Sequence, residues 1–112
     1  MISRIWHGWT TRENADRYEA IVSREVIPGI LAMRIPGFEK IELYRRSREV
    51  DVEFVTVMWF SNLEAVKAFV GEDYETAHVP QRAREVLARF DARSQHYDIL
   101  LSNDAAASDC KV

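Results

Sequence analysis

Two of the three histidines lie in surroundings suited to proton transfer. His7 stands between aromatic residues in IWHGW, and His78 follows a tyrosine by four residues in DYETAH. The ordinary pKa of histidine lies close to neutral pH, so either side chain can take a proton from a phenol as a general base. A neutral imidazole can also bind iron. We therefore predict His7 and His78 as the catalytic residues.

Structural roles are also open for both histidines. His78 directly precedes a Val-Pro step and could simply hydrogen-bond a helix end. His7 could be satisfied by a partner on a neighbouring strand, such as His96 or Tyr97. The sequence alone does not choose between these roles and chemistry.

Four aromatic side chains are predicted to contact a planar substrate, because aromatic walls suit a flat ring. Tyr74 could donate a hydrogen bond to an oxygen on that ring, and Trp59 could stack on it. Trp9 and Phe69 complete the predicted substrate-binding set. Packing in the hydrophobic core is the alternative for Trp59 and Tyr74.

The sequence predicts no metal site built from its own donors. His7, His78 and His96 have neither the HxH nor the HxxxH spacing that brings two imidazoles onto one ion. The single cysteine, Cys110, lies in the polar C-terminal segment. A zinc site would therefore lack a set of ligands.

Four stretches have the residue pattern of β-strands: ISRIWHGWTT, IPGFEKIELYRR, VDVEFVTVMWF and SQHYDILL. In the first stretch, Arg4 and Trp6 alternate with His7 and Trp9, so bulky side chains lie on both faces of the strand. The polar turn RSRE joins the second and third stretches, which predicts an antiparallel hairpin.

Helix signals separate these strands. Thr10 and Glu13 have capping-box spacing, which predicts a helix from about residue 12 to 33. Pro28 should bend this helix or end its regular part, because proline removes a backbone donor.

A second helical region is predicted in two pieces. Ser61 and Glu64 repeat the capping-box spacing and open a helix that Gly71 ends. Pro80 is a favourable first residue for the helix PQRAREVLARF.

The resulting order is strand, helix, strand, strand, broken helix, strand. This order predicts the α+β class and a ferredoxin-like split βαβ fold, with a four-stranded antiparallel sheet and helices on one face. Large apolar side chains on both faces of the strands predict a homodimer in which two bare sheet faces pack together.

Length and composition indicate one domain, which we place at residues 2–101, followed by a polar tail at 102–112. The chain has 112 residues, of which 47% are hydrophobic. Its 15 basic and 18 acidic residues are mixed along the sequence, so we expect no binding to nucleic acid. The sequence has no signal-peptide pattern and no apolar run near the roughly 20 residues of a membrane span, so we expect a cytoplasmic protein without membrane contact.

Residues of about 2 to 100 resemble the antibiotic biosynthesis monooxygenase group of the dimeric α+β barrel superfamily. The resemblance lies in the PGF turn, the segment VMWFSNLEAVKAF and the acidic and aromatic bend that leads to AH. It implies a homodimer that binds a small phenolic or polyketide-like aromatic compound between sheet and helices. It also implies oxidation by molecular oxygen without a cofactor. A binding or stress-response module on the same dimer, without chemistry, is the alternative.

The segment DYETAH also resembles haem-degrading relatives, in which the histidine of an Ala-His pair is the axial iron ligand. His78 occupies that place. Those relatives carry a tryptophan on the preceding helix and an asparagine on the first strand, whereas this chain offers Phe69 and either His7 or Gly8. Haem binding is therefore the lower-ranked alternative.

Overall fold

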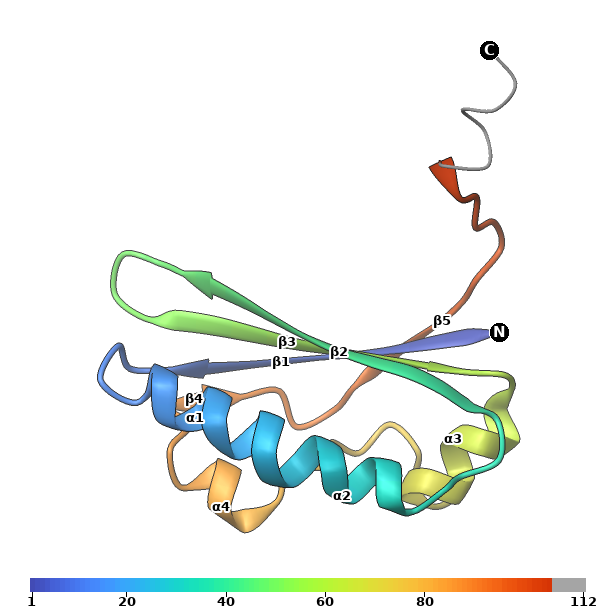
Figure 1. Ribbon diagram of the computed structural model, residues 1–112, viewed down its shortest axis with the longest axis horizontal. Helices are drawn as coiled ribbons and strands as arrows, with labels where there is room; N and C mark the ends of the chain where they lie inside the picture. The colour runs from blue at the N-terminus through green and yellow to red at the C-terminus, as the bar shows by residue number, and fades with distance from the viewer. Residues whose placement is uncertain (106–112) are drawn as a thin grey trace.

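An antiparallel sheet carries helices on one face only, in a computed structural model that describes residues 1–105 (Figure 1). The long strands are β1 (Ile2–Thr10), β2 (Phe38–Ser47) and β3 (Val52–Phe60). Most of the predicted tail, including Cys110, lies outside the described residues. No helix in the described part is long and apolar enough to cross a membrane.

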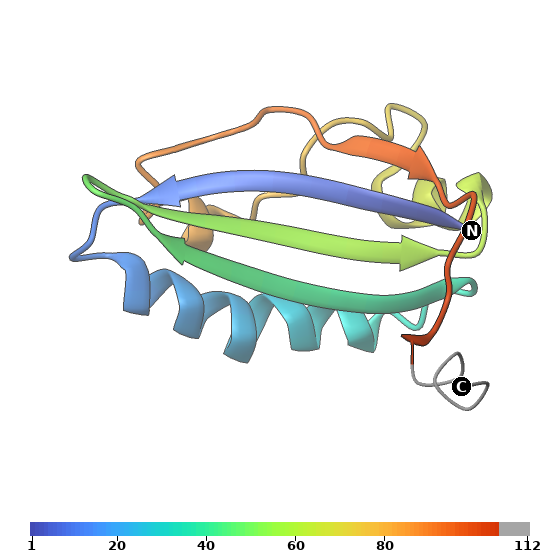
Figure 2. The ribbon, with the colours of Figure 1, turned by 90° about the horizontal axis from the view of Figure 1, so that it is seen from above.

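The strand order is β2-β3-β1, and two short strands share the far edge of β1 (Figure 2). β4 (Arg89–Phe90) pairs with the end of β1, and β5 (Gln95–Asp98) pairs with its beginning, all antiparallel. The hairpin of β2 and β3 and the ferredoxin-like α+β fold are confirmed. The sheet has five strands rather than the predicted four, because β4 and β5 both pair with the same edge of β1.

The first helix runs in three consecutive pieces, α1 (Ala15–Ile21), the π-helical η1 (Val22–Val26) and α2 (Ile27–Ala32). The π-helical turn lies directly before Pro28, so the regular helix is interrupted there as predicted. Proline crowds the carbonyl of the preceding turn, and a wider turn relieves that crowding.

The predicted capping box at Thr10 is wrong. Thr10 is the last residue of β1 and pairs with Val52, so its backbone is extended rather than at a helix start. The helix instead begins at Ala15, after Asn14.

The capping box predicted at Ser61 is also displaced. Asn62 caps α3 (Leu63–Val70), and its side-chain oxygen accepts a hydrogen bond from the Ala65 N–H at 3.0 Å. Ser61 donates instead to Glu39 on β2, at 2.5 Å. Gly71 ends the helix as predicted, with φ at 94° and its N–H donating to the carbonyl of Lys67 at 2.7 Å.

The helix predicted from Pro80 is much shorter than expected. α4 (Gln81–Arg84) has four residues, and the chain then returns to the sheet as β4. The N–H of Ala88 donates to the Trp9 carbonyl at 2.8 Å, and the N–H of Asp91 donates to the His7 carbonyl at 3.0 Å. The unpaired edge of β1 therefore takes a segment whose local pattern is helical.

The ring of Trp6 closely approaches the backbone of β1 at Gly8. A methyl group added at Gly8 would lie 2.5 Å from Cη2 of Trp6 and 3.1 Å from Cδ2 of Leu87. By contrast, a methyl group at Gly29 in α2 would meet no described atom within 4 Å.

We predict that Gly8→Ala lowers the free energy of unfolding by about 1–3 kcal/mol, because the added methyl overpacks the core. Gly29→Ala is the matched control and should leave stability unchanged or raise it by up to about 1 kcal/mol, since alanine favours a helix. Urea unfolding followed by circular dichroism measures both. Equal stability of the two variants would contradict the packing at Gly8.

Candidate functional site

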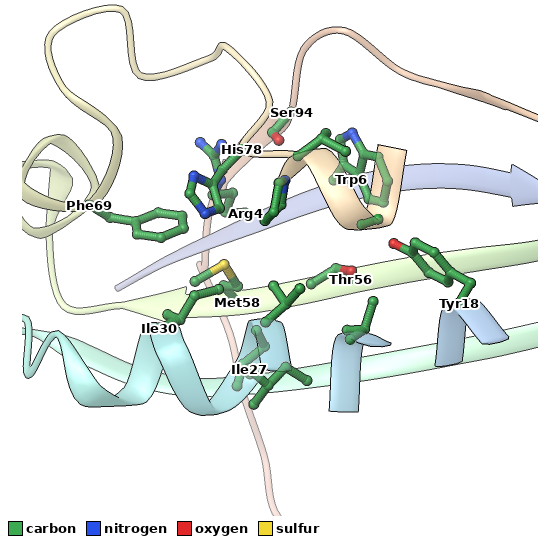
Figure 3. Close-up of a pocket in the computed structure, with 16 residues that line it drawn as sticks. Arg4, Trp6, Tyr18, Ile27, Ile30, Thr56, Met58, Phe69, His78 and Ser94 are labelled. Carbon is green, nitrogen blue, oxygen red and sulfur yellow. The ribbon is translucent and has the colours of Figure 1, made fainter. Parts of the chain in front are cut away.

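A cavity of about 50 Å³ lies between the sheet and the helices, mostly lined by apolar side chains (Figure 3). Its polar lining is small and comes from four different segments of the chain. The apolar lining includes Trp6, Tyr18, Ile27, Ile30, Met58 and Phe69, and the polar lining includes Arg4, Thr56, His78 and Ser94. We call this space the inner cavity.

A second pocket of about 290 Å³ lies beside the first, against α2 and the start of α4. The two spaces share four lining residues, so they are neighbours: Val26, Ile30, His78 and Pro80. We call the second space the outer pocket. Its rim carries an ion pair between Arg82 Nε and Glu25 Oε1 at 3.0 Å.

Arg4 on β1 is buried at the inner cavity, with only 3% of its surface exposed. Its guanidinium donates to the carbonyl oxygens of Tyr74 at 2.5 Å and Thr76 at 3.0 Å. It also lies 2.9 Å from Nε2 of His96. Burial lowers the pKa of Arg4 to about 10, so the group stays charged at neutral pH.

The contact with Arg4 fixes the protonation of His96. A guanidinium can only donate, so Nε2 of His96 must accept, and the ring is neutral with its proton on Nδ1. The pKa of His96 is lowered accordingly, first by burial and then by the Arg4 charge, with Glu75 acting in the opposite direction.

His78 stands where the inner cavity meets the outer pocket, and its ring lies 5.0 Å from that of Phe69. Its pKa is lowered from the ordinary histidine value, first by burial and then by the nearby charge of Arg4. Figure 3 shows the Arg4 and His78 side chains together at one end of the cavity. A neutral imidazole in this position can accept a proton from a bound molecule.

The structure places His7 on the other face of the sheet, because it alternates with Arg4 and Trp6 along β1. Nδ1 of His7 lies 2.9 Å from Oε2 of Glu53, which also pairs with Arg46 at 2.8 Å. The hydrogen bond from His7 is the main reason that the pKa of Glu53 is lowered. His7 does not line the inner cavity or the outer pocket, so it does not share a space with His78.

The four aromatic residues predicted to bind substrate do not lie together, and only one of them lines the inner cavity. Phe69 lines the inner cavity. Trp9 lies under the guanidinium of Arg89 at 3.7 Å and Trp59 under Lys40 at 5.3 Å, both on the face without helices. Tyr74 contributes its backbone carbonyl to Arg4, while its ring packs edge-on against His96 at 5.2 Å.

Sequence reasoning missed Arg4, Tyr18 and Ser94 as cavity residues. A signal for Arg4 was present, because it is a charged residue in the middle of a strand that carries bulky side chains on both faces. The sequence offered no comparable signal for Tyr18 or Ser94.

The sequence matches no family model and no curated protein. The fold is nevertheless similar to solved structures. A mutant of MhuD with two manganese protoporphyrin IX molecules bound per active site is 18% identical, with a TM-score of 0.65, over 93% of this chain and 99% of that chain. A candidate antibiotic biosynthesis monooxygenase from Bacillus cereus is 17% identical, with a TM-score of 0.61, over 92% and 96% of the two chains.

SnoaB, a cofactor-independent oxygenase from Streptomyces nogalater, is 15% identical, with a TM-score of 0.57, over 90% of this chain and 95% of that chain. At these identities the likeness shows the fold alone. It is the fold that the resemblance to the antibiotic biosynthesis monooxygenase group predicts.

Each space by itself is smaller than the roughly 300–1,000 Å³ of ordinary ligand pockets, since the inner cavity measures about 50 Å³ and the outer pocket about 290 Å³. His78 is of the right type for an axial ligand of haem iron. We derive no step that involves haem.

We predict that the free energy of unfolding decreases as the pH falls from about 7.5 to about 5. The lowered pKa values of His78 and His96 mean that the unfolded chain binds these protons more readily than the folded chain. The stabilisation is therefore complete above the ordinary histidine pKa and is lost as the pH falls below it.

Urea unfolding at a series of pH values measures this dependence, and His78→Gln should make it shallower. Between about pH 7.5 and 8.5 both histidines are neutral in either state, so that interval is the internal control. An unchanged slope in the His78→Gln variant would contradict the burial of a neutral His78.

Proposed function

We propose that this chain is a cofactor-independent monooxygenase-like protein that binds a small phenolic aromatic compound. The observation that carries the proposal is the position of His78, a histidine of lowered pKa where the outer pocket meets the inner cavity. A general base needs to be neutral before the substrate arrives, and burial together with Arg4 keeps His78 in that form.

The volumes of the outer pocket and the inner cavity indicate which part of the ligand each would hold. An apolar cavity of roughly 150 Å³ admits benzene, so an aromatic ring fits the outer pocket of about 290 Å³ but not the inner cavity of about 50 Å³. The ring then lies in the outer pocket, and its polar end points inward past His78.

The proposed reaction uses the electrons of the substrate itself. His78 accepts a proton from the phenol or from an acidic ring carbon, and the resulting anion transfers electrons to molecular oxygen. A carbon–oxygen bond forms at a ring CH₂ group. One oxygen atom stays as a ketone, and the other leaves as water with the two hydrogens of that carbon.

We predict that His78→Gln lowers the rate of oxygen uptake with an anthrone-like phenol by about 10²–10⁴-fold, because the base is lost. An oxygen electrode and product analysis measure the rate. His7→Gln is the same change on the opposite sheet face and should retain most of the activity.

Equal rates in wild type and His78→Gln would contradict the assigned base. Stoichiometric binding of aromatic compounds with no oxygen uptake by the wild type would favour the alternative, a binding module without chemistry.

We also propose that two copies associate through the sheet face that carries no helix. Figure 1 shows α1, α2, α3 and α4 on the opposite side of the sheet. Tyr44 and Tyr97 on this face are 46% and 55% exposed, and Val55 lies at its centre between His7 and Tyr44. Apolar groups of this size on an open sheet favour association.

We predict that the wild type sediments as a dimer and that Val55→Glu weakens the dimer at least about 100-fold, because a carboxylate would be buried without a partner. Val50→Glu is the matched control, since Val50 is 79% exposed in the hairpin turn. Sedimentation equilibrium measures both. A monomeric wild type would exclude the proposed assembly.

A further inference from the structure

We propose that the inner cavity is an anion subsite, in which Arg4 binds the carboxylate of an aromatic acid whose ring lies in the outer pocket. This inference rests on the pocket of the proposed function and specifies the chemical class of its ligand. It concerns binding, so it can be tested apart from any reaction with oxygen.

The charge of Arg4 has no ionic partner in the described part of the chain. Among the described residues, Arg4 has no carboxylate within ion-pair distance, and its hydrogen bonds go to two carbonyls and one neutral imidazole. A buried cation is normally paired with an anion. Besides these dipoles, the protein supplies the ring of Phe69, whose centroid lies 5.7 Å from the guanidinium carbon. Neither carries a negative charge, so the charge of Arg4 has no anionic partner among the described residues.

Only one acidic side chain lines the two spaces among residues 1–105, namely Glu25, and it is engaged by Arg82 at the outer rim. Arg82 therefore has a carboxylate partner, whereas Arg4 has none. The positive charge available to a ligand is at the inner end, which a ligand reaches by passing His78.

Arg4 also has hydrogen-bond donors to spare. A guanidinium has five N–H donors. The contacts to Tyr74, Thr76 and His96 occupy both donors of Nη1 and one of Nη2. The remaining N–H groups are on Nε and Nη2, which form one edge of the guanidinium. That edge matches the two oxygens of a carboxylate.

Size and surroundings agree with this assignment. The inner cavity of about 50 Å³ holds a carboxylate but no aromatic ring. Three of its lining side chains, Tyr18, Thr56 and Ser94, carry hydroxyl groups, which can donate to an anion.

The test compares benzoate with benzamide, which have nearly the same shape and differ in charge. Isothermal titration calorimetry on the full-length wild type should show benzoate binding about 10- to 100-fold more tightly. Arg4→Met should reduce that ratio to about 1 while benzamide binding persists, which shows that the pocket is still formed. Arg4→Lys should keep part of the preference, because it keeps the charge.

Arg17→Met is the matched control, since Arg17 is exposed on α1 and lines neither space. It should retain the full preference for benzoate. The wild-type ratio tests the proposal without any variant, so the test does not depend on Arg4→Met folding. A ratio near 1 in the wild type, or a ratio that survives in folded Arg4→Met, overturns the subsite.

The outcomes separate this inference from the proposed function. Arg4-dependent benzoate binding, combined with no oxygen uptake on anthrone-like phenols, supports the subsite and excludes the monooxygenase activity. Oxygen uptake on neutral phenols, with no preference for benzoate, removes the subsite alone. Failure of both aromatic probes to bind overturns the subsite together with the pocket.

Discussion

The buried guanidinium of Arg4 is the interaction on which the site depends. It joins β1 to the bend after α3 through the carbonyls of Tyr74 and Thr76, and it reaches β5 through His96. A buried charge bound by carbonyl dipoles tolerates little movement, because each lost contact leaves a desolvated donor. His78 follows directly on this bend, and burial, followed by the charge of Arg4, lowers the pKa of its imidazole.

Alternation along β1 divides the chemistry of the chain between two faces. Arg4 and Trp6 face the helices and line the inner cavity, while His7 and Trp9 face away. Polar contacts on the second face, such as the pair of His7 and Glu53, therefore belong to a surface and not to the cavity. One strand thus lines the proposed ligand site on one side and the proposed dimer contact on the other.

At the edge of the sheet beyond β1, strand pairing overrides the local helical pattern of the sequence. The segment from Pro80 has apolar residues at helical spacing, yet it is helical only over Gln81–Arg84 and then pairs with β1. Free N–H and C=O groups on the edge of β1 need partners, and a nearby chain satisfies them more fully than a last exposed helical turn does. Propensity is a weak guide where such an edge is available.

The sequence by itself determined the order of the elements as far as α3, the hairpin, the end of α3 at Gly71 and the alternation that separates His7 from Trp6. These features follow from local periodicity and turn chemistry, which act within a few residues. Only the tertiary structure decided which face of β1 the helices cover, and hence that His78 meets Arg4 rather than His7. That choice depends on packing between segments about 70 residues apart in the chain, such as Arg4 and Tyr74, and periodicity along one strand carries no information about it.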